Sequence, residues 1–246
     1  MIPKIINYCW FGRNPLPELA QKCIASWRKY LPDYEIKEWN EDNFDVNIIP
    51  YTSEAYQAKK YAFVSDYARF WILYKFGGIY FDTDVEVIKP MDYIISQGPF
   101  MGCEKESGKG VNSLRVAPGL GLGMDSGNTI LNELLSLYSS IHFTNPDGTF
   151  NQKTIVSYTT DILIKNGLKD TSEIQCVAGI YIYPKEYLCP KDYITGKLKI
   201  TDYTVAIHHY GATWIDFKQK LYFFVSRHIS PNLAVFCSKV IKKFKG

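Results

Sequence analysis

The stretch "SDYARFWILYKFGGIYFDTDVEV", residues 65–87, contains two closely spaced aspartates in an otherwise apolar run. Its first half is apolar on nearly all sides of a helix, which is typical of a helix buried in a core. Gly77 and Gly78 are expected to end that helix, because glycine readily adopts the left-handed conformation of helix C-termini. The stretch therefore predicts a core helix followed by a buried strand that carries Asp82 and Asp84.

The two aspartates need a partner. Side chains alternate along a strand, so Asp82 and Asp84 are expected to share one face. Burying carboxylates without compensation costs on the order of several kcal/mol, so the pair requires a cation or a proton. Carboxylate oxygens at a strand end suit Mg²⁺ or Mn²⁺, completed by water and phosphate oxygens. The structural alternative is a pair that caps a turn or meets a basic side chain, and the apolar surroundings favour the metal.

The preceding helix has few strongly polar residues, and two of them lie on one face. Asp66 and Arg69 are spaced i and i+3, so they are neighbours on the helix surface. They form a simple ion pair, or they hold sugar hydroxyls at the mouth of the sheet, because a guanidinium and a carboxylate fix orientation.

Strand-like and helix-like segments alternate along the chain. This alternation predicts an α/β fold with a mostly parallel central sheet flanked by helices. The predicted strands besides 77–87 are residues 4–10, 34–40, 119–124 and 204–210, and the predicted helices are 18–30, 53–76, 128–141 and 152–167.

Composition indicates one globular unit. The 246 residues are 46% hydrophobic, which suffices for a large core, and no linker-like run divides them. The six cysteines have no metal-ligand spacing and the first ten residues do not resemble a signal peptide, so we expect a reducing, cytoplasmic location. No apolar run is long enough to span a bilayer. The net charge of +3 gives no indication of a nucleic-acid partner.

Charge is unevenly distributed. From Lys218 onward the chain has seven basic residues and no acidic one. Apolar residues recur there at helical spacing beside the lysines. We therefore expect a domain at 1–217 and a basic amphipathic helical tail at 218–246. The tail either docks on the domain or lies on an anionic membrane surface, which would make the protein peripheral on the inner face of the cell membrane.

Five segments together resemble the bacterial capsular-polysaccharide branch of glycosyltransferase family 32, whose members carry a DXD sugar-nucleotide motif. They are "IPKIINYCWFG", "KCIASWRKYLPDYEIKEWN", "AKKYAFVSDYARFWILYKFGGIYFDTDVEV", "IYPKEYLCP" and "AIHHYGATW". The long central block also resembles the large clostridial glucosylating toxins. The resemblance implies a GT-A type, single Rossmann-like domain that uses a divalent cation and a nucleotide-sugar donor and retains the anomeric configuration.

The resemblance also implies roles for individual residues. Asp82 and Asp84 would bind Mn²⁺ or Mg²⁺. Asp66, Arg69 and Asp82 would hold the donor at the reacting centre. The metal would stabilise the departing nucleoside diphosphate as a Lewis acid. No residue is assignable as a covalent nucleophile.

Aromatic residues are expected to bind the nucleotide. The resemblance matches Trp10 to an aromatic that stacks on the base, although a core tryptophan is the alternative. Tyr8 and Tyr80 would line the same pocket, and Trp214 would cover the diphosphate.

A histidine from the C-terminal part is expected to complete the metal site. His208 and His209 end a predicted strand, and a neutral imidazole suits Mn²⁺. The spacing to Trp214 favours His209, and the choice between the two stays open.

These observations predict a retaining, metal-dependent glycosyltransferase. It would move a hexose-type sugar from a nucleotide-diphosphate donor, such as a UDP-sugar, to a lipid-linked saccharide in capsular or surface polysaccharide synthesis. A polyprenyl-diphosphate-linked saccharide is the expected acceptor. The alternatives are a nucleotidyltransferase, which also uses paired aspartates, and a non-catalytic sugar-nucleotide-binding module.

Overall fold

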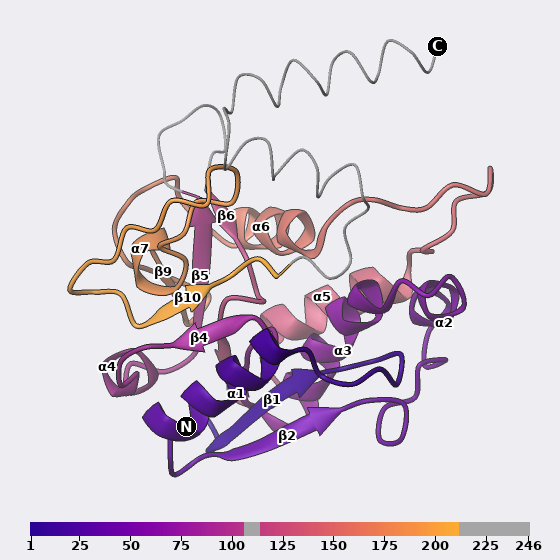
Figure 1. Cartoon of the computed structure of the whole chain (residues 1–246). Helices are drawn as coiled ribbons and strands as arrows, with labels where there is room; N and C mark the ends of the chain where they lie inside the picture. Colours follow the sequence, from indigo (N-terminus) through magenta and orange to yellow (C-terminus); the bar gives the residue numbers. More distant parts are fainter. Residues whose placement is uncertain (106–113, 212–246) are drawn as a thin grey trace.

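The computed structural model describes residues 1–105 and 114–211, and it confirms the predicted α/β architecture (Figure 1). The helices are α1 (Glu18–Tyr30), α2 (Pro50–Gln57), α3 (Tyr61–Phe76), α4 (Asp92–Ile95), α5 (Thr129–Ser139), α6 (Ile155–Lys165) and α7 (Lys185–Leu188). The strands are β1 (Ile5–Cys9), β2 (Glu35–Trp39), β3 (Gly78–Tyr80), β4 (Val85–Val87), β5 (Phe100–Lys105), β6 (Arg115–Val116), β7 (Leu122–Met124), β8 (Gln175–Val177), β9 (Ile180–Tyr183) and β10 (Ala206–His208).

The described part of the chain forms an eight-stranded sheet in the order β2-β1-β3-β7-β5-β9-β8, with β6 paired to β5. β1 is parallel to β2 and β3, β5 is parallel to β9, and β7 is antiparallel to both β3 and β5. Consequently β2, β1, β3, β5 and β9 all run in one direction, and the predicted mostly parallel sheet is confirmed. The carboxyl ends of β1 and β3 therefore lie side by side at one edge.

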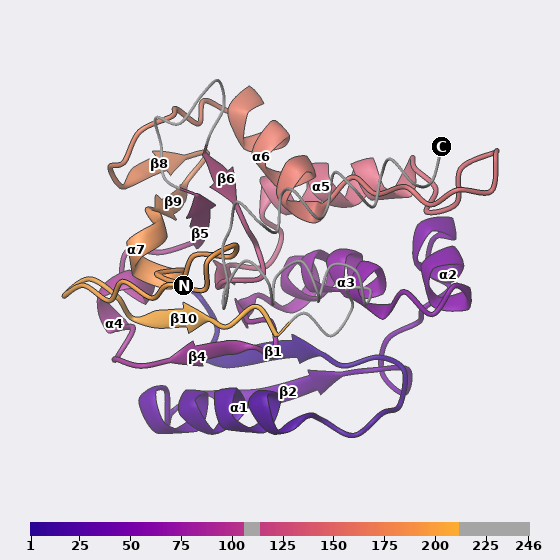
Figure 2. The same cartoon turned by 45° about the horizontal axis from the view of Figure 1, so that its top comes forward.

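Two hydrophobic cores lie on opposite faces of this sheet. Along β3, Ile79 packs in the core that contains α1, whereas Tyr80 packs in the core that contains α3. Figure 2 shows α1 on one side of β1 and β2, and α3 and α5 on the other. The period-2 alternation of a strand that is covered on both faces produces this division.

The strand predicted over residues 77–87 is interrupted at the aspartates. β3 ends at Tyr80, and the N–H of Val85 donates to the carbonyl of Asp82 at 3.0 Å, which closes a turn. The chain then continues as β4, which leaves the main sheet and pairs with β10 in a separate two-stranded sheet. Asp82 and Asp84 are therefore turn residues, and the predicted strand alternation does not describe them.

The helix predicted over residues 53–76 is two helices. α2 begins earlier, at Pro50, and ends at Gln57, and α3 begins at Tyr61. Lys59 between them has a φ of 56°, a left-handed conformation that an α-helix cannot contain. The predicted end of α3 is confirmed, because Gly77 follows it with a φ of 65°.

Most other predicted elements are present within a few residues of their expected bounds. The segment 204–210 contains β10, although this strand belongs to the small sheet and not to the main one. Within the described residues no helix is both long and apolar enough to cross a bilayer. The expected tail at 218–246 and the boundary at 217 lie outside the described residues.

Candidate active site

The two aspartates lie just beyond the carboxyl end of β3. The N–H of Asp82 donates to the carbonyl of Gly119 at 3.0 Å, which fixes the start of the turn. The side chains of Asp82 and Asp84 are 31% and 20% exposed, so both can be reached by a ligand. The carboxyl edge of parallel strands is where α/β proteins commonly bind ligands.

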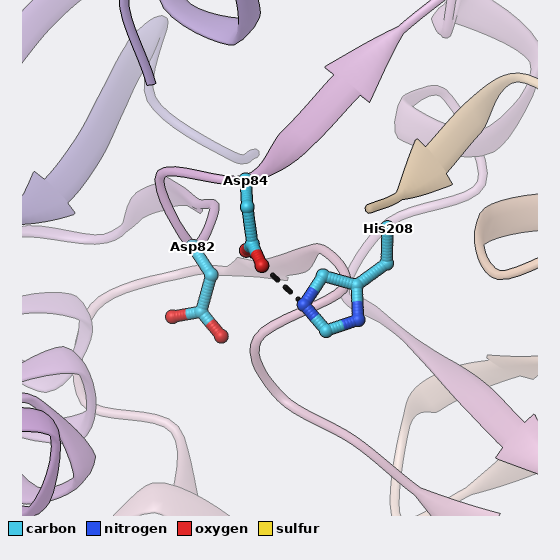
Figure 3. Close-up of side chains that lie close together, drawn as sticks. All are labelled: Asp82, Asp84 and His208. Carbon is cyan, nitrogen blue, oxygen red and sulfur yellow. Dashed lines mark ion pairs between the residues drawn. The ribbon is translucent and has the colours of Figure 1, made fainter. Parts of the chain in front are cut away.

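His208 lies beside these aspartates. The antiparallel pairing of β10 with β4 places His208 opposite Val85. As a result, Nε2 of His208 is 3.1 Å from Oδ1 of Asp84. Potential ligand atoms of Asp82, Asp84 and His208 all lie within 4.8 Å of one another. Figure 3 shows the three side chains converging from the turn and from the end of β10.

His209, which the sequence favoured as the metal ligand, lies on the other side of β10. Its Nε2 is 2.7 Å from Oε2 of Glu86, and Lys22 of α1 lies 3.1 Å from the other oxygen of Glu86. Neighbouring residues of a strand face opposite sides, so only one of the two histidines can meet the aspartates. The structure places His208 there.

Arg69 is buried between two carboxylates. Its Nη2 is 3.1 Å from Oδ1 of Asp66, and its Nη1 is 3.2 Å from Oδ1 of Asp82. Tyr80 lies beneath this group, with its ring 4.7 Å from the guanidinium carbon and its hydroxyl donating to Asp82 at 3.2 Å. The interrupted strand thus connects the aspartate–histidine cluster to the Asp66–Arg69 pair through Asp82.

The glycine-rich segment before β7 provides space for Asp82. A Cβ atom at Gly119 would lie 1.8 Å from Oδ2 of Asp82 and 3.0 Å from Nη1 of Arg69. Such distances are far below van der Waals contact, so this backbone can approach the carboxylate only as glycine. Residues 119–124 were predicted as a strand, and their alternate glycines suggested a close approach of the backbone to a sugar; in the structure only Leu122–Met124 form β7, and Gly119 approaches Asp82.

Electrostatics support an ionised Asp84. Burial raises the pKa of this carboxyl, but the imidazole of His208 and the N–H of Gly211, which donates to Oδ2 at 2.7 Å, lower the pKa further than burial raises it. Burial in turn lowers the pKa of His208, and Asp84 raises it well above its usual value. Without a metal, the two side chains are thus a mutually stabilised ion pair.

Asp66 has the opposite shift. Burial raises the pKa of its carboxyl to about 7, although Arg69 acts to lower that pKa and Asp82 adds to the rise. The group therefore titrates near neutral pH.

The expected nucleotide-binding aromatics differ in their surroundings. Trp10 follows β1, is partly exposed, and donates from Nε1 to the carbonyl of Asn14 at 2.6 Å. Tyr8 is buried, and its hydroxyl donates to Glu38 at 2.6 Å. Tyr80 is buried in the site, as described above. Trp214 lies outside the described residues.

Sequence reasoning assigned no role to Asn7, which the structure shows to be buried in the middle of β1. Its side-chain oxygen accepts from Nε1 of Trp39 at 2.9 Å, and its Nδ2 donates to the carbonyl of Ile79 at 3.3 Å. The signal in the sequence that could have identified Asn7 was a single amide side chain within an apolar strand. This residue joins β1 to both neighbouring strands and so supports the edge at which the site lies.

The site residues fit a divalent cation. Two carboxylates and an imidazole within reach of one another are a donor set that suits Mn²⁺, and the carboxylates alone suit Mg²⁺. Asp82, Asp84 and His208 would hold the ion, and water or phosphate oxygens would complete its coordination. The described residues contain no other group of this kind.

Comparison with known proteins gives a family match to part of the chain. Residues 17–101 match the family described as "Glycosyltransferase sugar-binding region containing DXD motif". The matched segment includes Asp66, Arg69 and both aspartates of the turn.

Three similar proteins have names that indicate glycosyl transfer. Inositol phosphoceramide mannosyltransferases 1 and 3 of Schizosaccharomyces pombe are 30% and 31% identical to 41% and 48% of this chain. The alignments span 33% and 34% of those proteins, about a third of their length. An uncharacterized glycosyltransferase of Acanthamoeba polyphaga mimivirus is 27% identical over 92% of both chains.

Two solved structures were also similar. The PaToxG glycosyltransferase has a TM-score of 0.49 at 20% identity, covering 67% of this chain and 69% of that one. A glycosyltransferase involved in glycosylating the major capsid of PBCV-1 has a TM-score of 0.48 at 13% identity, covering 85% and 94%.

The sequence matches support the coarser part of the predicted identity. They support a glycosyltransferase of the family 32 type with a DXD motif. The capsular-polysaccharide branch stays a prediction.

Proposed function

We propose that this protein is a retaining, metal-dependent glycosyltransferase that transfers a hexose-type sugar from a nucleotide-diphosphate donor, with UDP as the nucleotide. The observation that carries the proposal is the continuity of Asp84, Asp82 and Arg69. A metal-binding cluster and a buried guanidinium share one carboxylate, Asp82. The sugar and the diphosphate of one donor would therefore lie next to each other in this site.

Each part of the site has a distinct role in this proposal. Mn²⁺ or Mg²⁺, held by Asp82, Asp84 and His208, would supply Lewis-acid stabilisation of the diphosphate leaving group. Arg69, fixed by Asp66, would orient the sugar hydroxyls through its planar donors. Trp10 would stack on the base.

The remaining aromatic residues have supporting roles. Tyr80 would hold Asp82 and Arg69 in place, and Tyr8 would support the floor of the nucleotide pocket from the core. Trp214 would cover the diphosphate, as the sequence resemblance implies.

We further propose a lipid-linked saccharide as the acceptor, in the synthesis of capsular or surface polysaccharide. The two yeast relatives are named for mannosyl transfer to inositol phosphoceramide, which is a lipid, and this supports a membrane-bound acceptor. The basic tail at 218–246 is consistent with a peripheral position on the inner face of the membrane. A polyprenyl diphosphate carrier is the acceptor we would test first.

A panel of nucleotide sugars tests the proposal. The purified full chain is incubated with each donor, with and without Mn²⁺, and release of the nucleoside diphosphate is measured. We expect slow hydrolysis of one donor that requires the metal and is lost in Asp84→Asn. Release of pyrophosphate from a nucleoside triphosphate and a sugar phosphate would instead indicate a nucleotidyltransferase. Tight donor binding without any release would indicate a binding module.

A further inference from the structure

The segment that follows β10 is fastened to Asp84 by its backbone. The N–H of His209 donates to the carbonyl of Asp84 at 2.9 Å, and the N–H of Gly211 donates to its carboxylate at 2.7 Å. Nζ of Lys191 also donates to the carbonyl of His209 at 3.0 Å. The residue between these contacts, Tyr210, therefore has little conformational freedom.

Tyr210 has an uncommon backbone conformation. Its φ is 55°, in the left-handed region that costs a residue with a side chain roughly 1–2 kcal/mol. A glycine would adopt this conformation without that cost. A tyrosine here indicates that its side chain contributes something that offsets the strain.

The Tyr210 ring packs against the imidazole of His208. The two ring centroids are 4.3 Å apart at an interplanar angle of 57°. The tyrosine ring also packs against Tyr193, with 4.8 Å between centroids. Its hydroxyl lies 3.0 Å from Sγ of Cys189, in a hydrogen bond. The ring is thus held in place by two neighbours while it contacts His208.

His208 has no carboxylate or carbonyl on its second ring nitrogen within the described residues. Metal-binding histidines commonly donate their second ring N–H to a carboxylate, a carbonyl or water. Nδ1 of His208 is buried and has no hydrogen-bond partner of good geometry within the described residues, although the Cys189 thiol is near enough to help raise the pKa of the imidazole. A thiol is a weak hydrogen-bonding group, so the orientation of this ring depends largely on packing.

We propose that Tyr210 is a positioning residue, whose ring holds the imidazole of His208 toward Asp82 and Asp84 in the orientation that binds a divalent cation. This inference rests on the metal site of the proposed function. It adds that the site depends on an aromatic ring at position 210 and that the left-handed backbone there serves to bring this ring onto His208.

Binding of Mn²⁺ alone to the full chain, measured by electron paramagnetic resonance, tests the proposal. We expect Tyr210→Ala and Tyr210→Gly to weaken Mn²⁺ binding about 10-fold, the lower end of the effect of removing an outer-sphere partner. Tyr210→Phe, which keeps the ring, should stay within about 3-fold of the wild type. Tyr203→Ala, which removes an exposed tyrosine from the same region, is the control and should leave binding unchanged.

A spectroscopic signature separates positioning from general loss of structure. Electron spin echo modulation from an imidazole nitrogen reports directly whether a histidine binds Mn²⁺. The signal should be present in the wild type, Tyr210→Phe and His209→Ala, and absent from His208→Ala and Tyr210→Gly. Tyr210→Gly also removes the backbone strain, so it should be more stable to heat than Tyr210→Ala while binding the metal equally poorly.

Some outcomes would overturn the inference. Folded Tyr210→Ala and Tyr210→Gly that bind Mn²⁺ like the wild type, with the nitrogen signal intact, would show that the ring has no positioning role. Absence of Mn²⁺ binding by the wild type would overturn the metal site and this inference together. Mn²⁺ binding that depends on Tyr210 in a protein that hydrolyses no donor would support the inference and reject only the proposed function.

Discussion

The carboxylate of Asp82 occupies the space that a side chain at Gly119 would need, since a Cβ atom there would lie 1.8 Å from Oδ2. We expect Gly119→Ala to displace Asp82 and Arg69 together and to reduce donor hydrolysis at least about 100-fold, because small displacements at a reacting centre have effects of this size. Steady-state hydrolysis of the donor measures the effect.

The matched control for this variant is Gly123→Ala. A Cβ atom there would lie 2.2 Å from Phe100, so the change also overpacks the protein and should cost roughly 1–3 kcal/mol of stability. Because Gly123 pairs with Ile79 and the nearest atoms to its added Cβ all belong to Phe100, donor hydrolysis and Mn²⁺ affinity of the folded fraction should be retained. Equal activity of both variants would show that the approach to Asp82 is unimportant.

The two neighbouring histidines should have opposite phenotypes. We expect His208→Ala to weaken Mn²⁺ binding and to lower kcat at least about 10-fold, because a ligand to the ion at the leaving group is lost. His209→Ala should keep activity and lose about 1 kcal/mol of stability or less, since it removes only a partly exposed contact with Glu86. Calorimetric metal titration and thermal unfolding distinguish them. If His209→Ala weakens Mn²⁺ binding and His208→Ala does not, His209 is the metal ligand, as the sequence favoured.

Asp66 should make stability depend on pH. Its pKa is about 7 in the folded protein and near 3.8 in the unfolded chain. Between these values the folded state retains a proton that the unfolded state has lost, so the contribution to stability falls as pH rises from about 4 to about 7. In Asp66→Asn this loss, on the order of a few kcal/mol, should disappear. The free energy of unfolding of both proteins is measured with urea at pH 5 and pH 8. The same change between the two pH values in the wild type and in Asp66→Asn would contradict the raised pKa.

Trp10 and Arg69 should affect the reaction at different steps. Trp10→Ala is expected to raise KM for the donor with little change in kcat, because stacking on a base far from the reacting bond is lost equally from ground state and transition state. Arg69→Lys should raise KM and lower kcat, since a lysine cannot bridge Asp66 and Asp82 with planar donors. An unfolded Trp10→Ala whose folded fraction binds nucleotide normally would assign the tryptophan to the core.

The basic tail is expected to bind membranes. Deleting residues 231–246 removes four lysines, each worth roughly 1 kcal/mol near anionic lipid. We expect weaker binding to liposomes that contain phosphatidylglycerol and slower transfer to a lipid-linked acceptor, with donor hydrolysis unchanged. Replacing the four lysines by glutamine should have a similar effect without shortening the chain. Unchanged liposome binding by both proteins would show that the tail is no membrane anchor.

Local signals in the sequence predicted much of this fold. Gly77 marked the end of α3 because its conformation is favoured only by glycine. The apolar, β-rich run at residues 4–10 and the all-round apolar surface of α3 indicated a strand and a helix buried in a core. At Lys59 the helix breaks without glycine or proline, so no local signal predicts the break.

The site was predictable only where its residues are close in sequence. Asp66, Arg69, Asp82 and Asp84 all lie within one short block. The choice between His208 and His209 depends on the register of β10 against β4, and a shift of one residue exchanges the faces of a strand. That register is set by contacts between distant segments. The same holds for the turn at Asp82, which is fixed by a hydrogen bond from the N–H of Asp82 to the carbonyl of Gly119.

The pairing of β4 with β10 also affects the stage of folding at which the candidate metal site can form. It joins positions 85 and 208, so the candidate metal site closes one of the longest loops in the described chain. The chain must lose loop-closure entropy before a contact between distant residues can stabilise it. Contacts of this kind are therefore slow to form. During synthesis, the residues of α3 and β3 are made long before His208. The aspartates are therefore present before their histidine partner. Metal capture would then accompany the late stages of folding, and a partly made chain would display the DXD turn without a working site.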